Sequence, residues 1–420
     1  MKNKTRVVIT GMGTVNPCGN TIQEYWGNLI NGKSGITRLQ KFDGHLFESL
    51  HCKIGGEVKN FDPKSYGRNR DEIKKINKMD PFVQFALAAS EEAVKDSGLQ
   101  FLDKNPHMAV IMGNGMGGLT TYQEQMETMY KQGIKYISPF TIPSAMTNAI
   151  AAQISIRYTI TGPTFSVNSA CASSLHAIVC AVKEILLGEA QVVITGGSEA
   201  DIVGLPYGAF TNMQALVTGD FNECPTTASR PFDKTRSGFV IGEGAGVLIL
   251  EKLEHALARR AHIYAEIIGY GLTSDANDIT APDVNGPIQA MKKALANASI
   301  GSNDVDYINA HGTSTPINDR IETIAIKEVF GKRAYEIPIN STKSMTGHLL
   351  GGAGAIETIA CVMTIKDGII HPTINYQNPD PECDLDYVPN ESIKTDVRIA
   401  MNNALGFGGH NACLILKRYE

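Results

Sequence analysis

The stretch RVVITGMG at residues 6–13 and its echo IYAEIIGYG at residues 263–271 decide the predicted fold of this 420-residue chain. Each is a short run of β-branched and aliphatic residues that ends at closely spaced glycines, as expected of a buried strand that meets a turn. The same pattern therefore opens two parts of the chain. Such a repeat predicts an α/β unit that is present twice, although unrelated α/β proteins also show echoes of this kind.

The segments around these two stretches extend the pattern. Apolar residues at helical spacing occupy residues 80–97 in the first part and 288–298 in the second. Further strands are predicted at 108–112, 191–195, 246–250, 305–312 and 411–420. Strands that alternate with helices predict a mostly parallel sheet with helices on its faces. We therefore predict an N-terminal half at 1–257 and a C-terminal half at 258–420.

The composition is that of a globular protein, with 43% hydrophobic and 19% charged residues and a net charge of −5. This balance gives the whole chain no attraction for nucleic acid or for an anionic membrane. The eight cysteines show neither a CxxC pair nor zinc-ligand spacing, so we expect reduced thiols, a cytoplasmic location and no metal. We see no signal peptide and no apolar run of about 20 residues, so no membrane association is expected.

A candidate nucleophile lies in NSACASSLHAIVC at residues 168–180. Asn168 or Ser169 can cap a helix, which places Cys171 in its first turn. Unpaired N–H groups and the helix dipole favour a thiolate there, and the small flanking residues leave room for a substrate. The alternative, an inert buried thiol, is preferred for Cys180 and stays open for Cys171.

Two histidines follow at the ends of strand-like runs. His311 lies in NAHGTSTP (309–316), and His348 lies in KSMTGHLLGG (343–352), ahead of a helix of small residues. In parallel α/β sheets, ligands bind beyond the carboxyl ends of the strands. One cysteine and two histidines at that edge can form a thioester site, in which neutral imidazoles donate hydrogen bonds to an oxyanion or enolate.

A glycine-rich loop, NALGFGGHNA at 403–412, completes the candidate site. It lacks the strand, GxGxxG and helix context of a dinucleotide site. Gly408 and Gly409 can instead present backbone N–H groups to an oxyanion, with Phe407 as a movable wall.

These motifs resemble those of the β-ketoacyl-acyl-carrier-protein synthases, most closely the elongating, synthase II-like branch. The Cys of SACASS, the His of NAHGTSTP, the Lys and His of KSMTGH, and the GFGGHN loop stand in the order typical of that family. TASRPFDKTRSGFVIGEGAG at 227–246 is a further specific match, and the likeness covers essentially the whole chain. The resemblance implies a thiolase-like fold, in which two similar α/β halves pack into αβαβα layers.

The resemblance also implies a decarboxylative Claisen condensation. Cys171 would take the acyl chain from a carrier-protein thioester, while His311 and His348 would support decarboxylation of malonyl-carrier protein and stabilise the enolate. The backbone N–H groups of Cys171 and Phe407 would form the oxyanion hole, and Phe407 would gate the site. The product would be 3-oxoacyl-carrier protein with release of carbon dioxide.

Further residues are carried over from the family in the same way. Lys343 and Glu322 would order the site around the histidines, and Thr313 and Thr315 would hold the phosphopantetheine arm of the carrier. No tightly bound cofactor is implied. Residues at the acyl pocket and loop would be Met116, Thr141, Pro206, Phe210, Gly408 and Gly409, and the first three of these depart from the residues usual in the branch.

The implied partners are an acyl carrier protein and a second subunit. The carrier would dock on the basic residues Lys74, Lys75, Lys78 and Lys135. The assembly would be a homodimer, or a heterodimer with a partner like a chain-length factor. Three alternatives remain: the ketosynthase of a type II polyketide synthase, a non-catalytic chain-length partner, which the intact Cys171 opposes, and a thiolase that uses coenzyme A, for which Cys413 is poorly placed.

Overall fold

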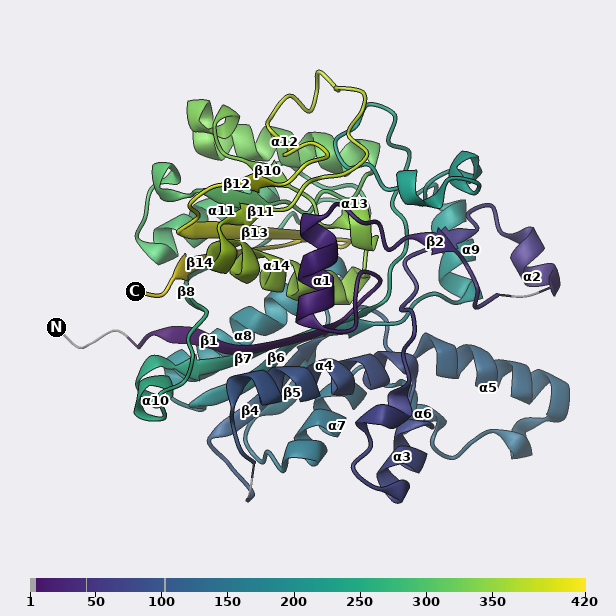
Figure 1. Cartoon of the computed structure of the whole chain (residues 1–420). Helices are drawn as coiled ribbons and strands as arrows, with labels where there is room; N and C mark the ends of the chain where they lie inside the picture. The colour runs from purple at the N-terminus through teal and green to yellow at the C-terminus, as the bar shows by residue number, and fades with distance from the viewer. Residues whose placement is uncertain (1–4, 43, 102) are drawn as a thin grey trace.

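Ten strands form one continuous sheet in the computed structural model, which describes residues 5–42, 44–101 and 103–420 (Figure 1). In the first half the strands are β1 (Val7–Val15), β4 (Met108–Gly113), β5 (Thr164–Val167), β6 (Val192–Glu199) and β7 (Gly244–Lys252). In the second half they are β8 (Ala265–Ser274), β9 (Tyr307–Asn309), β10 (Ile339–Asn340), β13 (Ile399–Gly406) and β14 (His410–Arg418). The predicted strands are thus present in both halves.

The strand order shows that the unit is duplicated. It runs β5-β4-β6-β7-β1 in the first half and continues β8-β14-β13-β9-β10, which is the same order reversed. The halves join where β1 pairs antiparallel with β8, Val7 opposite Ile267. The predicted duplicated α/β fold is therefore confirmed, and chance similarity does not explain the echo. The predicted boundary at 257/258 lies within α10 (Leu253–Ala258) and stays a prediction.

The sheet is mixed, and the prediction of a mostly parallel sheet was wrong. β4 pairs in parallel with β5 and β6, and β9 does so with β10 and β13. In each half, however, the last strand enters antiparallel between two others: β7 between β1 and β6, and β14 between β8 and β13. Direct hairpin closure, as between β13 and β14, permits an antiparallel neighbour without a crossover helix.

The helices form three layers, as Figure 1 shows: one between the two halves of the sheet and one on the outer face of each half. Two of them, α8 (Ser173–Leu187) and α14 (Ala353–Asp367), pack against each other between the halves. On the outer faces, α4 (Pro81–Ser97) and α7 (Ala149–Tyr158) cover the first half, and α11 (Asn285–Ala298) and α12 (Pro316–Phe330) cover the second. The result is the predicted αβαβα arrangement.

The glycines of the two echoing stretches explain why outer helices lie so close to their strands. A methyl group on Gly13 of β1 would lie 2.0 Å from the Ala89 carbonyl oxygen of α4. In the second half, a methyl group on Gly271 of β8 would lie 1.9 Å from the Ala290 carbonyl oxygen of α11. Only glycine permits this approach, so the repeated pattern encodes a repeated helix–strand contact.

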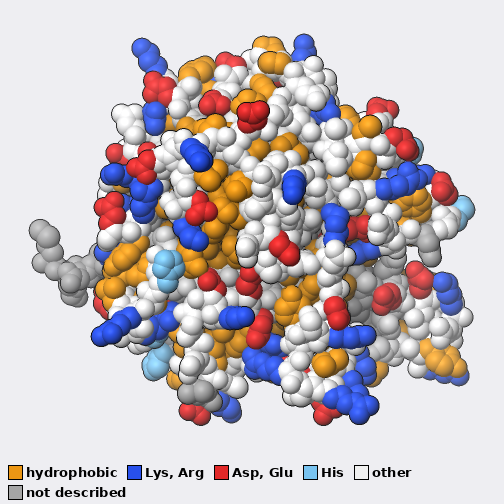
Figure 2. All heavy atoms as spheres, in the orientation of Figure 1, with side chains coloured by type: hydrophobic (Ala, Val, Ile, Leu, Met, Phe, Trp, Pro, Cys, Tyr) orange, Lys and Arg blue, Asp and Glu red, His pale blue; other side chains and the backbone are white. Residues whose placement is uncertain are grey.

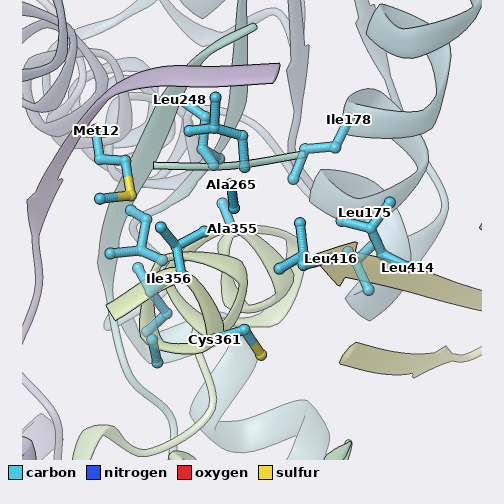
Figure 3. Packing of buried hydrophobic residues seen from close by; sticks show 14 of the residues in the cluster. Met12, Leu175, Ile178, Leu248, Ala265, Ala355, Ile356, Cys361, Leu414 and Leu416 are labelled. Carbon is cyan, nitrogen blue, oxygen red and sulfur yellow. The ribbon is translucent and has the colours of Figure 1, made fainter. Parts of the chain in front are cut away.

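The middle layer contains a large cluster of buried hydrophobic residues. Leu175 and Ile178 of α8 and Ile356 of α14 belong to it, and side chains from strands of both halves complete it (Figure 3). Burial of such aliphatic side chains contributes about 1.5–3 kcal/mol each. By length and composition, the 18-residue segment Ala170–Leu187 could cross a membrane, although the sequence analysis identified no such apolar run. In the structure, however, 61% of its residues are buried, as in a core helix.

The remaining elements surround this frame. The helices are α1 (Ile22–Ile30), α2 (Gly44–Ser49), α3 (Arg70–Ile76), α5 (Leu119–Gln132), α6 (Thr141–Ala145), α9 (Gly204–Asn212) and α13 (Lys343–Thr346). The short strands β2 (Thr37–Arg38) and β3 (Ile54–Gly55) form one pair, and β11 (Ile369–Ile370) and β12 (Ile393–Lys394) form another.

Candidate active site

The nucleophile candidate lies in a tight turn that leads from β5 into α8. Cys171 is the central residue of a single 3-10 turn, Ala170–Ala172, rather than a member of the α-helix itself. Ala170 has a φ of +49°, a conformation that L-residues rarely adopt and that often marks functional turns. Neither candidate cap acts as predicted: the Ser169 side chain does not cap the turn, and Asn168 donates to the Gly115 carbonyl oxygen.

Both histidines converge on this cysteine. One ligand atom from each of Cys171, His311 and His348 lies within 4.8 Å of the others. The imidazole rings of the two histidines meet edge to face, with centroids 5.2 Å apart. His311 directly follows the β9 region of the second half and His348 follows α13, so the site is assembled from both halves.

The histidines are held neutral and differ in their contacts. Burial, and then the nearby charge of Lys343, lower the pKa of each ring well below its usual value. The Lys343 ammonium lies 3.3 Å from His311 Nδ1, and because it can only donate, the His311 proton is assigned to Nε2. Among the described residues, neither ring nitrogen of His348 has a hydrogen-bond partner. Both rings can therefore offer an N–H to a substrate oxygen.

Lys343 and Glu322 support the histidines in different ways. Lys343 Nζ donates to the His311 carbonyl oxygen at 2.7 Å and forms a buried ion pair with Glu357 of α14. Glu322 of α12 accepts the backbone N–H groups of His311 and Gly312, each at 2.8 Å. Glu322 thus fixes the His311 turn, and the partner of Lys343 is Glu357.

Sequence reasoning missed Glu357. The signal was present, because it is the one charged residue in AGAIETIACVMTI (353–365), a stretch otherwise made of small and apolar residues. A carboxylate in such a helix is buried and requires a cationic partner. The choice of Lys343 depends on how α14 and α13 meet in space, which no local pattern encodes.

The three groups open into a cavity of about 1200 Å³. Its wall includes Thr313 and Thr315, whose hydroxyl oxygens are 2.9 Å apart, and the apolar side chains of Met116 and Phe210. Phe407 lies in the turn between β13 and β14, and its ring centroid is 6.5 Å from that of Phe210. Residues predicted from widely separated motifs therefore share one chamber.

Some predicted positions lie elsewhere. Among the described residues that line the cavity, Gly409 is present, while Thr141, Pro206 and Gly408 are absent. Thr141 starts the short helix α6, Pro206 is buried in α9, and a methyl group on Gly408 would lie 3.1 Å from the His410 ring. The expectation that Thr141 and Pro206 line or border the acyl pocket, and that Gly408 belongs to the substrate-binding loop, stays a prediction.

The thiol is less acidic than the sequence suggested. Burial raises the pKa of Cys171 to about 12, although the charge of Lys343 and the backbone N–H of Phe407 act in the opposite direction. The expectation of a thiolate favoured by the helix dipole is therefore corrected for the unliganded site. A single turn ahead of α8 offers a few N–H groups, and desolvation of the buried sulfur outweighs them.

The raised pKa of Cys171 predicts the pH dependence of thiol alkylation. The thiolate fraction of a group with so high a pKa rises about tenfold per pH unit, so iodoacetamide should modify Cys171 at a rate that climbs steadily from about pH 7 to 9. Mass spectrometry of the labelled peptide measures this rate. A rate that levels off below about pH 8 would contradict the burial argument, and a Cys171→Ala variant provides the blank.

A thiol and two imidazoles are also ligand types of zinc sites. The three groups lie close enough to one another to share an ion. The sequence expectation that no metal binds therefore stays a prediction, which elemental analysis of the purified protein can check.

Comparisons with known proteins agree with this site. The family model described as beta-ketoacyl synthase, N-terminal domain, matches residues 4–256, and the model of the C-terminal domain matches residues 264–377. A relative from Synechocystis named 3-oxoacyl-[acyl-carrier-protein] synthase 2 is 46% identical, and one of the same name from Coxiella burnetii is 45% identical, each over 99% of both chains.

Solved structures extend the comparison to the fold. A beta-ketoacyl synthase from Burkholderia phymatum superposes with a TM-score of 0.91 at 34% identity, over 99% of this chain and 100% of that one. A structure described as a type II PKS acyl-carrier protein in complex with its ketosynthase superposes with a TM-score of 0.89 at 34% identity, over 100% of both chains.

Proposed function

The chain belongs to the β-ketoacyl synthase family, and from this premise we propose that it is a 3-oxoacyl-acyl-carrier-protein synthase of fatty-acid elongation. The observation that carries the proposal is the meeting of Cys171, His311 and His348 in one buried chamber. A neutral thiol becomes a nucleophile when its proton is lost on attack, and two imidazole N–H groups suit an oxygen that gains negative charge.

The reaction follows from this geometry in two stages. In the first, Cys171 Sγ attacks the acyl thioester of a carrier protein, its proton goes to the departing carrier thiol, and the acyl chain is left on Cys171. In the second, the malonyl thioester loses carbon dioxide, and the electron pair of the broken C–C bond forms an enolate. His311 and His348 donate hydrogen bonds to its oxygen. The enolate carbon then attacks the acyl carbonyl and expels the Cys171 thiolate, which takes up one proton from solvent, so that each condensation consumes one proton.

The experiment that tests the function supplies malonyl-carrier protein together with acyl-carrier proteins of several lengths. We expect a 3-oxoacyl product two carbons longer than the acyl donor, identified by mass spectrometry. Products with repeated unreduced keto groups would favour the polyketide alternative, which the names of the two curated relatives at 46% and 45% identity disfavour. Failure to form any 3-oxoacyl product would end the proposal.

The carrier protein is proposed to dock beside α3. Lys74, Lys75 and Lys78 are exposed there, and Figure 2 shows basic side chains interspersed with acidic ones at the lower edge of the molecule, over this helix. Lys135 is exposed after α5. Complementary charge mainly accelerates encounter and fixes orientation. The cavity mouth, with Thr313 and Thr315, would receive the phosphopantetheine arm.

Charge reversal at this surface should weaken carrier binding alone. We expect Lys74→Glu combined with Lys78→Glu to raise KM for the acyl-carrier protein about tenfold at low salt, with kcat nearly unchanged. Because salt screens exposed charges, the difference should shrink as ionic strength increases. Lys292→Glu, at an exposed lysine on α11, is the matched control. An equal rise in KM for the control would contradict docking at α3.

A second copy of the chain is proposed to cover α5. None of the fourteen described residues of α5 is buried, and Tyr122, Met126 and Tyr130 expose an apolar stripe at helical spacing. Figure 1 shows the helix projecting at the lower right of the molecule. Together with Leu205 the stripe forms an apolar groove, and β5 ends the described sheet with an unpaired edge. Such faces are normally covered by another subunit.

The dimer can be tested by mass measurement. Sedimentation equilibrium of the parent protein should give the mass of two chains. Met126→Glu combined with Tyr130→Glu should give the mass of one, because two carboxylates would be buried without partners in the interface. A parent protein that sediments as a single chain would contradict the proposal.

A further inference from the structure

A buried carboxylate joins two segments of the chamber wall. Glu199 is the last residue of β6 and is fully buried. Its Oε2 accepts the backbone N–H of Gly115 at 2.6 Å and that of Gly351 at 2.9 Å, while Oε1 accepts the N–H of Met116 at 3.1 Å. One side chain therefore holds two segments that are far apart in sequence, and it does so through backbone groups that tolerate little movement.

The sequence makes room for this carboxylate with two glycines. A methyl group on Gly115 would lie 2.7 Å from Glu199 Oε2, and one on Gly351 would lie 2.5 Å from the same oxygen. Neither position requires glycine for its backbone conformation, since both have ordinary φ values. The carboxylate explains Gly115, whereas Gly351 is required both by the carboxylate and by the Gly115 backbone nitrogen, which would lie 2.3 Å from a methyl group at 351.

The two segments that Glu199 joins, at Gly115–Met116 and at Gly351, belong to different parts of the chamber wall. Gly115 and Met116 line the cavity, and Met116 packs in the same apolar cluster as Cys171 and Phe210. Gly351 follows Leu350, which also lines the cavity and stands two residues after His348. Glu199 thus fixes the acyl-side wall to the turn that carries a candidate catalytic imidazole.

A second carboxylate in the site acts in the same way. Glu322 accepts two backbone N–H groups at the His311 turn. Burial raises the pKa of Glu199 and of Glu322 to about 7, and backbone N–H groups oppose this shift in both. The Glu199 charge also adds to the effect of burial in raising the pKa of Cys171.

We propose that Glu199 is a positioning residue that sets acyl-chain selectivity by holding the Gly115–Met116 wall against the turn at Gly351. The inference rests on the proposed condensing function and deepens it. A short acyl chain on Cys171 would end before the wall, whereas a long chain would extend along Met116. Loss of the carboxylate should therefore disfavour long chains far more than short ones.

The test compares selectivity in Glu199→Gln and in the parent. We expect the ratio of kcat/KM for a long-chain over a short-chain acyl-carrier protein to fall about tenfold, since the amide offers a single acceptor oxygen to three N–H groups. Glu199→Asp keeps the charge but is one methylene shorter, so its ratio should lie between the two. If Glu199→Gln does not fold, as judged by circular dichroism and its melting temperature, the Glu199→Asp ratio decides.

The matched control is Glu92→Gln. Glu92 also accepts two backbone N–H groups, from Thr14 and Ile22, and burial raises its pKa to about 7. Neither Thr14 nor Ile22 lines the cavity, whereas Gly115 and Met116, which Glu199 holds, do. In Glu92→Gln, the ratio of kcat/KM for the long-chain over the short-chain acyl-carrier protein should equal that of the parent. An unchanged ratio in both folded Glu199 variants, or an equal fall in Glu92→Gln, would overturn the proposal. A parent protein that makes no 3-oxoacyl product would instead refute the proposed function.

Discussion

Replacing Cys171 by alanine should abolish the acyl-enzyme and slow condensation by at least about 1,000-fold, because no other thiol in the described chain meets both histidines. The turn should survive the change, since the Cys171 side chain is not part of the backbone bonds that form it. Incubation with an acyl-carrier protein, followed by mass spectrometry of the intact protein, measures the adduct directly. The parent should gain one acyl group and the variant none.

A matched control comes from α8, the helix that follows the Cys171 turn. Cys180 is partly buried on α8 and lies outside the cavity lining, so Cys180→Ala should acylate and condense as the parent does. The assignment of the nucleophile would be wrong if Cys171→Ala still carried the acyl group, or if Cys180→Ala lost it. Because the histidines act on the malonyl substrate, release of carbon dioxide from malonyl-carrier protein should persist in Cys171→Ala.

Replacing His348 by alanine should separate the two stages of the reaction. Acyl transfer to Cys171 needs the thiol and backbone N–H groups, so it should continue in His348→Ala. Decarboxylation and condensation should fall by about 100- to 1,000-fold, the usual cost of removing one donor to a developing oxyanion. Rapid-quench measurement of the acyl-enzyme, together with counting of released labelled carbon dioxide, distinguishes the stages.

His107→Ala provides the comparison, because His107 is exposed and far in sequence from either histidine motif. Equal loss of acylation and condensation in His348→Ala would show that His348 acts in the first stage as well. Full condensation activity in that variant would remove His348 from the proposed mechanism.

The fold was largely predictable from local patterns. The stretches 6–13 and 263–271 contain glycines that allow a helix to pack close to a strand, and this contact is present in both halves. Strand direction was not predictable in the same way, because an antiparallel β7 or β14 has the same apolar pattern as a parallel strand. Direction depends on how the chain returns to the sheet, and periodicity does not record that path.

In the candidate site, too, some features could be predicted from local sequence and others could not. Cys171, His311 and His348 were predictable because each lies in a short motif whose residue types suit thioester chemistry. The contacts that hold them were not: Lys343 pairs with Glu357, and Glu199 binds Gly115 and Gly351 across long stretches of sequence. The state of the thiol was also misjudged, since a helix-start pattern indicates nearby N–H groups but not how completely the sulfur is desolvated.

The unbroken run of strands from β5 to β10 has a mechanical consequence. Since β1 is hydrogen-bonded to β8 and the two central helices pack together, the two halves of the described chain form one continuous unit and are not lobes joined by a linker. Entry of a bulky tethered substrate must therefore depend on small displacements of peripheral segments. The three residues between β13 and β14, two of them glycines with positive φ, are one such segment. The Gly408 N–H donates to the Ile279 carbonyl oxygen at 2.7 Å, so a displacement of this turn would involve the segment that follows β8 as well.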